Sequence, residues 1–427
     1  MPSEARAHRC GLADRRSRSG ACDDARVIDD PIALVELLHA GPTRLVYEFA
    51  GAGVSALALL HAVGGSSRTL LEATDRYAER SLAEGVGGPP ETAVAADVAV
   101  ALAVHARARA RHLAGGDESI AGIGVTATIA TDRVKRGEHR AWAAAADALG
   151  VRVAGLTLRK GARTREDEER LVGRLALRLM AEAKGVLREL KLDLLEGEFL
   201  ETEFRPGPEL ADFAAGGRPM LAIDALGGCV DALPWAAAGA SGTGALGSTG
   251  GAVVSGAFHP LHDGHLGLAG AAQRHLRRPV AFELAMANAD KPDVDQTEVH
   301  RRAAQFAGRG PLILTRAARF DEKATLLPDT VFVLGADTAA RVLEARFYPS
   351  PGGLDAAMDA LRAAGGSFLV AGRRSSAGFL TLSDLAVPPR HADLFAALPA
   401  SAFRADVSST EIRSAWARGP APDRRQP

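Results

Sequence analysis

The part of the chain that follows Gly251 alternates regularly between apolar and amphipathic segments. The apolar segments "GAVVSGAF", "VAFELA", "PLILT", "TVFVLGAD" and "SFLVAG" are separated by stretches of helical character after Gly264, around 298–308 and after Thr338. Strands that alternate with helices in this way predict a parallel, doubly wound sheet. Ligands of such sheets bind beyond the carboxyl ends of the strands, so we expect functional residues there.

The first half of the chain also mixes strands and helices. Strands are expected at "TRLVYEFA", "SSRTLLEAT" and "SIAGIGVTATIA", and a hairpin is expected to turn at 147–150. The segment "GAGVSALALLHAVGG" predicts a helix, and further helices are expected over 75–84 and 90–113. The charged segment 165–189 has leucines among acids and bases, which is typical of a surface helix. This half is therefore also predicted to be α/β.

The length of 427 residues is too great for one ordinary core and predicts at least two domains. Residues 1–26 are expected to be a disordered leader, because they are rich in arginine and lack the apolar segment of a signal peptide. A transit peptide is the alternative, against which the acidic residues of the leader count. The domains are expected over 27–187 and 251–420. The connector 188–250 between them ends in a loop of small residues, "PWAAAGASGTGALGSTGG".

Charge and composition limit the class of partner. With 51 basic and 52 acidic residues, the chain has no overall field that would draw it to nucleic acid or to an anionic membrane. Cys10, Cys22 and Cys229 lack the spacing of metal ligands, and the sequence has no run of about 18 apolar residues, so we expect a cytoplasmic protein. Aromatic residues make up only 5% of the chain, whereas alanine and glycine are abundant, and helices should pack closely through small side chains.

The first apolar segment after Gly251 leads into the sequence "SGAFHPLHDGHLGLAG". Here Gly256 would leave room for a nucleotide at the strand end, and Gly264 would open the next helix, whose N-terminal N–H groups suit a phosphate. His262 and His265 would turn their rings into one pocket and donate hydrogen bonds to phosphate oxygens. A histidine pair with structural contacts alone is the alternative. A zinc site is less favoured, since no cysteine or acid at ligand spacing completes it.

This stretch resembles the Gly-x-Phe-x-Pro-x-His-x-Gly-His signature of the nucleotidylyltransferase superfamily, particularly of nicotinate and nicotinamide mononucleotide adenylyltransferases. A second signature of that superfamily, Ser-Ser-Thr-x-Ile-Arg, has its counterpart in "VSSTEIRSA". The resemblance covers about 251–418 and implies a Rossmann-like C-terminal domain in which His262 and His265 are catalytic. The nucleotide-binding residues that it implies are Gly256, Phe258, His259, Gly264, Gly335, Asp337, Arg373, Ser408, Ser409, Thr410 and Arg413.

Several of these positions allow a second interpretation. The segment "VAGRR" places Arg373 or Arg374 where the family often holds the triphosphate, and a solvated arginine pair is the other interpretation. Lys291 and Arg302 are weaker candidates from the segment after the second strand. His259 stands where many mononucleotide adenylyltransferases have Asp or Asn before the proline, which bears on the substrate more than on the class of reaction.

The activity that the resemblance implies is adenylyl transfer. A phosphate of a mononucleotide-type acceptor would attack the α-phosphorus of ATP, with Mg²⁺ as cofactor, and pyrophosphate would leave. Nicotinamide or nicotinate mononucleotide is the favoured acceptor, and the expected partners are ATP and this acceptor, without nucleic acid or membrane. The alternatives are another nucleotidylyltransferase, acting on phosphopantetheine or using CTP, and a non-catalytic nucleotide-binding scaffold.

More loosely, 29–184 resembles the CinA-type nicotinamide-nucleotide amidase domain, through "YEFAGAGVSALALL" and "GIGVTATIATDR". That family has a serine nucleophile where this chain has Phe49, which cannot attack an amide. Two glycines of its second motif are replaced by Ala127 and Ala130. We therefore expect a non-hydrolytic domain that binds a nucleotide weakly or forms a homo-oligomer. Glu48, at a strand end, is expected on a solvated rim, and a functional role is the alternative.

Overall fold

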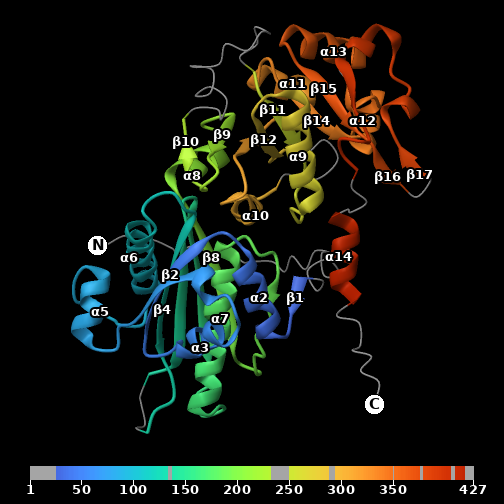
Figure 1. Cartoon of the computed structure of the whole chain (residues 1–427). Helices are drawn as coiled ribbons and strands as arrows, with labels where there is room; N and C mark the ends of the chain where they lie inside the picture. The colour runs from blue at the N-terminus through green and yellow to red at the C-terminus, as the bar shows by residue number, and fades with distance from the viewer. Residues whose placement is uncertain are drawn as a thin grey trace, which may run out of the picture.

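A computed structural model of the chain shows two large sheets with helices around them, and thus an α/β fold, as the sequence predicts. Figure 1 shows the first sheet in blue to green and most of the second in yellow to red. Within the described residues, no helix combines the length and the apolar character that crossing a membrane requires. Apart from Arg26, the expected leader lies outside the described residues. The structure describes residues 26–132, 137–231, 250–287, 294–349, 351–375, 378–404 and 409–418.

The first sheet contains β2 (Arg44–Ala50), β3 (Leu70–Asp75), β4 (Ile120–Thr128), β5 (His139–Ala146), β6 (Gly150–Leu158) and β8 (Phe199–Pro206). Their order is β3-β2-β4-β5-β6-β8, with β3, β2 and β4 parallel and the remaining neighbours antiparallel. The predicted hairpin turns between β5 and β6, where the Asp147 carboxylate accepts hydrogen bonds from two backbone N–H groups of the turn. The helices of this part are α2 (Pro31–Ala40), α3 (Val54–Ala62), α4 (Ser66–Thr69), α5 (Glu79–Val86), α6 (Ala96–Ala114) and α7 (Arg165–Ala183).

The second sheet contains β9 (Met220–Ile223), β10 (Cys229–Val230), β11 (Ala252–Ser255), β12 (Val280–Ala285), β13 (Leu312–Thr315), β14 (Val331–Gly335), β15 (Ser367–Ala371) and β18 (Phe395–Leu398). Six of them are parallel in the order β13-β12-β11-β14-β15-β18, so that the strands, numbered along the chain, lie in the order 3-2-1-4-5-6. The order reverses between β11 and β14. The helices are α8 (Pro208–Ala215), α9 (Asp263–Leu276), α10 (Gln296–Ala303), α11 (Phe320–Leu326), α12 (Ala336–Val342), α13 (Gly353–Ala363) and α14 (Ser409–Arg418).

Two short sheets and several 3-10 helices complete the structure. The short sheets pair β1 (Val27–Ile28) with β7 (Glu189–Leu190) and β16 (Arg373–Ser375) with β17 (Gly378–Leu380). The 3-10 helices are η3 (Ala304–Phe306), η4 (Ala345–Phe347), η5 (Leu382–Asp384) and η6 (Pro389–Leu394).

The described part of the expected connector 188–250 is folded and contributes to both large sheets. β8 forms the edge of the first sheet beside β6, whereas β9 and β10 extend the second sheet as antiparallel strands beyond β13. The chain therefore passes from one sheet to the other through α8, without a long linker at that point. Of the loop of small residues, 234–251, all residues up to 249 lie outside the described residues.

The helix α7 was expected on the surface, and this expectation is wrong. Its spaced leucines are at most 3% exposed, because the helix packs against α2 and α3 as well as against β4 and β5. Two of its acids are buried as well and are paired with bases: Glu168 with His139 Nδ1 at 2.8 Å, and Glu182 with Arg152 Nε at 2.7 Å. A helix with a charged sequence is thus part of the core, because its buried acids form pairs with basic side chains of neighbouring strands.

Close packing through small residues, expected from the composition, is clearest between α6 and β4. A Cβ atom added at Gly122 would lie 2.1 Å from the backbone nitrogen of Arg107, and one at Gly124 would lie 2.3 Å from the carbonyl oxygen of Ala99. Since no side chain fits in that space, these two glycines set the distance between helix and sheet.

Candidate active site

The sequence 256–265 lies at the carboxyl end of β11, beside the point at which the order of the strands reverses. Ligands of open parallel sheets bind at such points. Two cavities open here. The smaller, of about 50 Å³, brings together five of the residues that the resemblance implies, and we call it the histidine recess. It is lined by His262, Gly264, His265, Leu268, Gly335, Ala371, Gly372, Arg373 and Phe403.

The two histidines of the recess lie against each other. His262 precedes the first residue of α9 and His265 lies in its first turn, and their ring centroids are 3.8 Å apart with 29° between the planes. The backbone N–H of His262 donates to Nδ1 of His265 at 3.3 Å, so that the proton of a neutral His265 ring is on Nε2. Both ring nitrogens of His262 are buried and have no hydrogen-bond partner within the described residues. Since buried polar atoms are rarely unpaired, this ring is suited to a ligand.

Both imidazoles are neutral at pH 7 in the ligand-free protein. Burial lowers the pKa of His265 to about 3, with further lowering by His262 and by the Arg373 guanidinium. The pKa of His262 is also lowered, first by burial and then by Arg373. In this state each ring can donate one N–H, and the approach of a polyphosphate would raise both pKa values.

The far side of the recess comes from the ends of β14 and β15. Gly335 ends β14, and a Cβ atom there would lie 2.7 Å from Asp337 Oδ1, which shows how closely that side chain folds over the strand end. Arg373 Nη1 lies 3.6 Å from the same Asp337 oxygen. Of the two arginines considered, Arg373 lines the recess, whereas Arg374 is exposed and is not among its lining residues.

Phe258 lies in the core and not in a cavity. Its side chain is 1% exposed and packs edge-on against the rings of His265, Phe282 and Phe306, at centroid distances of 5.0 to 5.6 Å. A Cβ atom at Gly256 would lie 2.9 Å from the Phe258 ring. The glycine is therefore needed first for the packing of Phe258, and Phe258 in turn supports His265.

His259 faces the N-terminal half of the protein and lines neither cavity. Nη2 of Arg26 donates to its Nε2 at 2.7 Å, which leaves the proton on Nδ1, and Nδ1 lies 3.0 Å from Glu298 Oε1. The hydrogen bond to Glu298 raises the pKa of His259, but burial and the charges of Arg26 and Arg302 outweigh it and lower the pKa.

The second signature forms α14, which packs on the motif. Ser409 Oγ donates to the carbonyl oxygen of Pro260 at 3.0 Å, and the Arg413 guanidinium donates to the carbonyl oxygen of His259 and, at 3.1 Å, to Thr410 Oγ1. Ser408 lies outside the described residues. In the ligand-free protein Arg413 thus fixes the motif loop by holding a backbone oxygen.

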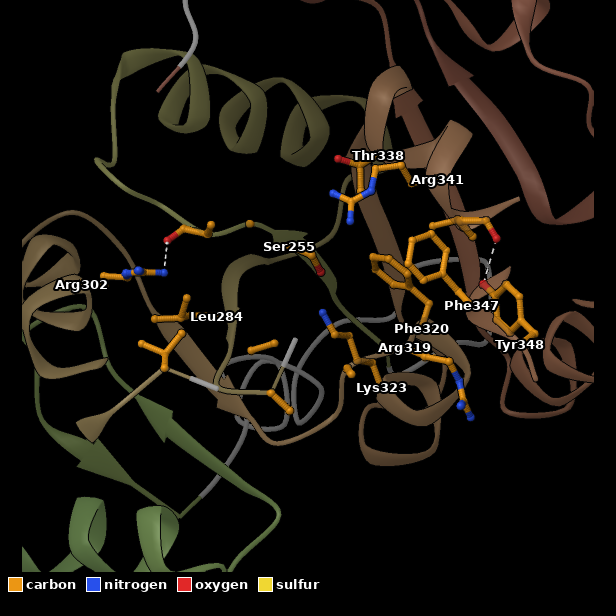
Figure 2. Close-up of a pocket in the computed structure, with 17 residues that line it drawn as sticks. Ser255, Leu284, Arg302, Arg319, Phe320, Lys323, Thr338, Arg341, Phe347 and Tyr348 are labelled. Carbon is orange, nitrogen blue, oxygen red and sulfur yellow. Dashed lines mark hydrogen bonds between the residues drawn. The ribbon is translucent and has the colours of Figure 1, made fainter. Parts of the chain in front are cut away.

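The larger cavity, of about 310 Å³, opens beside the motif at the ends of β11 and β12 and was not predicted. We call it the basic pocket, because four basic side chains line it and none of its described lining residues is acidic: Arg302, Arg319, Lys323 and Arg341. In Figure 2, Arg302 and Arg341 lie on opposite sides, and Lys323 lies near Ser255 between them. Aromatic rings of Phe320, Phe347 and Tyr348 complete one wall.

A buried ion pair fixes Lys323 in the basic pocket. Its ammonium lies 2.8 Å from Oε2 of Glu283, whose other oxygen accepts from the Thr315 hydroxyl at 2.6 Å. Beside it, the Ser255 hydroxyl is buried without a partner in the described part of the chain. The sequence signal for this pocket was the basic residues that follow the ends of two strands, in "PLILTRAARF" and "GADTAAR", where ligands of parallel sheets lie.

In the first half, the turn before α3 already holds an anion of its own. Glu169 Oε1 accepts hydrogen bonds from the backbone N–H groups of Gly53 at 2.9 Å and Ser55 at 3.0 Å. These are the groups that a helix N-terminus offers to a phosphate. A bound phosphate at this turn would first have to displace Glu169.

Glu48 was expected on a solvated rim, and it is fully buried instead. Its carboxylate is held by Arg76 Nε at 2.5 Å and by His105 Nδ1 at 2.8 Å. The two bases explain how a glutamate is tolerated within the strand, since a buried charge needs a partner.

No known family model and no curated protein matches the chain. Among solved structures, it is similar to a competence/damage inducible protein of Agrobacterium tumefaciens, with 18% identity over 38% of this chain and 93% of that one and a TM-score of 0.28. It is also similar to a competence-damaged protein (CinA) superfamily protein of Escherichia coli, with 18% identity over 38% and 90% and a TM-score of 0.28. A competence or damage-inducible protein of Enterobacter asburiae has 15% identity over 37% and 99%, with a TM-score of 0.30. Likenesses at these TM-scores assign neither a fold nor a function to the chain.

Proposed function

We propose that the protein transfers a nucleotidyl group from a nucleoside triphosphate, with ATP as the first choice, to a small phosphorylated acceptor. The observation that carries the proposal is the unpaired, buried ring of His262, stacked on His265 in a recess that Arg373 also lines. We further propose that the second sheet is Rossmann-like, because the strand order 3-2-1-4-5-6 is that of dinucleotide-binding sheets.

In the proposed reaction, an oxygen of the acceptor phosphate attacks the α-phosphorus in line. A bond forms between that oxygen and the α-phosphorus, and the bond from the α-phosphorus to the oxygen bridging to the β-phosphate breaks, so that its electron pair leaves with pyrophosphate. No redox change or covalent enzyme intermediate is needed. His262 and His265 would donate N–H groups to the phosphate oxygens, and Arg373 would supply positive charge.

Mg²⁺ would neutralise part of the charge of the triphosphate. Within the described residues, no group of three or more His, Cys, Asp or Glu side chains is placed to hold a metal ion. The ion would therefore be held mainly by phosphate oxygens and water, as Mg²⁺ often is when it binds with a nucleotide.

The two cavities suit different parts of the substrates. The basic pocket, at about 310 Å³, falls within the roughly 300–1,000 Å³ of small-molecule sites, and its bases and aromatic rings suit a phosphorylated acceptor with a planar ring. Nicotinamide and nicotinate mononucleotide have this chemistry and are the first acceptors to test. The recess, at about 50 Å³, admits a few atoms only, so a whole nucleotide requires Arg373 and Phe403 to move.

The test is pyrophosphate release by the full chain with Mg²⁺ and ATP or CTP, in the presence of nicotinamide mononucleotide, nicotinate mononucleotide or phosphopantetheine. Turnover with ATP and either mononucleotide supports the proposal as stated. Turnover with CTP or with phosphopantetheine moves the protein to another nucleotidylyltransferase class. Binding of ATP by calorimetry without turnover of any pair favours a nucleotide-binding scaffold. Folded protein that neither binds nor turns over any nucleotide would overturn the proposal.

A further inference from the structure

The motif loop, 256–262, is held from one side by side chains that follow β12. Gln305, which is 2% exposed, accepts from the backbone N–H of Leu261 at 2.8 Å and donates to the carbonyl oxygen of Phe258 at 2.9 Å. Arg302 Nη1 donates to the carbonyl oxygen of Ala257 at 3.3 Å. The backbone of the loop is therefore fixed by α10 and η3, and not by its own sequence alone.

One carboxylate gathers the charged groups around the loop. Glu298 Oε1 accepts from Arg302 Nε at 2.9 Å, from His259 Nδ1 at 3.0 Å and from Arg26 Nη2 at 3.3 Å. Burial alone would raise the pKa of Glu298, but the His259 hydrogen bond and the two guanidinium charges hold it well below its usual range. Glu298 is thus ionised at neutral pH and binds a loop residue, a pocket residue and a residue of the N-terminal half together.

Other side chains of α10 are also bound to the N-terminal half of the protein. His300, which is 1% exposed, lies 2.6 Å from the Asp147 carboxylate at the β5–β6 turn and packs on Phe204, with 4.4 Å between the ring centroids. Arg301 lies 3.1 Å from Glu189. Figure 1 shows α10 at this junction. The helix therefore connects the first sheet with the motif loop.

We propose that the N-terminal half is a working part of the transfer site, in that it positions the motif loop through Arg26 and α10, with Glu298 as the central positioning residue. Neither Arg26 nor Glu298 lines the two cavities in which the substrates are proposed to bind. The inference rests on the proposed function for its consequence in catalysis, but the positioning itself is a property of the protein without substrate.

The physical reason is geometric. The loop carries the His262 ring and leads into the N-terminus of α9, and both must meet the phosphates at fixed positions. A displacement of about 1 Å in such a group lowers the rate by a factor on the order of 100. Neutralising Glu298 would remove the negative charge that His259, Arg26 and Arg302 share. The attachment of the loop through His259 would weaken, while those through Gln305 and α14 would remain.

The experiment compares hydrogen exchange of the full chain in three variants, Arg26→Gln, Glu298→Gln and the matched control Glu72→Gln. Glu72 forms an ion pair with Arg109 in the first half, at 2.8 Å, and does not contact the loop. We expect the amides of Leu261 and His262 to exchange at least about tenfold faster in the first two variants. The amides of β11 and β14, and all amides near the motif in the control, should keep their rates. Unchanged exchange in the loop of folded Arg26→Gln protein would overturn the inference, whether or not Glu298→Gln folds.

A second measurement applies once turnover has been found. In Arg26→Gln we expect kcat to fall by roughly 10- to 100-fold while the unfolding temperature shifts little, whereas Glu72→Gln keeps the wild-type kcat. If the unfolding temperature of Arg26→Gln falls strongly together with kcat, Arg26 only stabilises the fold. Because exchange needs no substrate, absence of turnover would count against the proposed function and not against the positioning.

Discussion

At the scale of residues, the main feature is an imidazole without a hydrogen bond. The His262 ring lies over His265, and neither of its nitrogens is paired within the described residues. A group that is desolvated without compensation is tolerated where a ligand supplies the missing partner. Its removal should therefore affect chemistry more than stability.

We predict that His262→Ala lowers kcat by about 100-fold or more, as the loss of a transition-state donor does. The folded protein loses a stacking contact and no hydrogen bond, so the unfolding temperature should change little. Pyrophosphate release and thermal unfolding check the two parts. The control is His275→Ala, an exposed histidine near the end of the same helix, which should keep full activity. Full activity of His262→Ala would remove this ring from the mechanism.

The second prediction concerns the stability of the protein at acidic pH. Because burial lowers the pKa of His265 from 6.5 to about 3, the unfolded state binds more protons than the folded state between these values. The contribution of this histidine to stability is complete above pH 6.5 and is lost as the pH falls toward 3, by up to about 1.4 kcal/mol per pH unit. Denaturant unfolding of His265→Asn over this window should show a flatter pH dependence. An unchanged slope would mean that the ring is not desolvated.

The third prediction concerns the stability of the protein at alkaline pH. Lys184 is 2% exposed and donates to the carbonyl oxygens of Gly41 and Thr43, and burial, with the charges of Arg309 and Arg44, lowers its pKa from 10.5 to about 7. Between pH 7 and 10.5 the unfolded state binds the extra proton, so stability should rise with pH in that window. Lys184→Met should remove this rise, as measured by denaturant unfolding at pH 7 and 9. A rise that persists would have to come from other groups.

At the scale of elements, the distance between α6 and β4 is set by glycine. We predict that Gly124→Ala lowers the free energy of unfolding by about 3 kcal/mol, toward the upper end of overpacking costs, because its Cβ would lie 2.3 Å from backbone atoms that cannot turn aside. Gly64→Ala is the control, since nothing lies within 4 Å of the added atom. Equal stability of the two variants would show that α6 can move away from the sheet.

The positions of helices and strands could be predicted from the sequence better than the burial of each element. Alternation of strands and helices after Gly251 and the hairpin at Asp147 follow from local periodicity and turn residues, and the structure agrees with them. The burial of α7 could not be predicted in this way, because its acids Glu168 and Glu182 are neutralised by partners on other strands. Pairing between distant residues leaves no local pattern.

The same limit applies to the site. Residues adjacent to strand ends, such as His262, Gly335 and Arg373, could be predicted to meet, because the carboxyl ends of parallel strands lie at one edge of a sheet. The contact of Arg26 with His259 joins residues 233 positions apart, in two different halves of the chain, and no motif indicated it. The basic pocket was missed since its four bases come from three separate places in the chain: α10, the start of α11 and α12.

At the scale of the whole molecule, the two halves share buried charges. Asp147 of the first sheet is paired with His300 of α10, and although burial opposes ionisation, the charge and hydrogen bond of His300 lower the pKa of this carboxyl. Breaking such a pair costs about 3–5 kcal/mol, because the remaining charge is left buried. Loss of this pair would therefore destabilise the contact between the two halves and leave both hydrophobic cores intact.

We therefore predict that the wild-type chain unfolds in a single calorimetric transition and that His300→Ala separates it into two, one for each half. The measurement is scanning calorimetry of the full chain, with exposed His275→Ala as control. Two transitions in the wild type would mean that the junction does not couple the halves. One transition in His300→Ala would mean that the other junction contacts suffice.

The carboxylate of Glu169 at the start of α3 has a consequence for ligand competition. A group tethered within the same fold acts at an effective concentration of about a millimolar or more, whatever the composition of the solution. At equal intrinsic affinity, a free phosphorylated metabolite at micromolar levels does not outcompete it for the N–H groups of Gly53 and Ser55. Access to that turn is thus governed by one side chain, and Glu169→Ala, which removes the accepting oxygen, would open it to anions from solution.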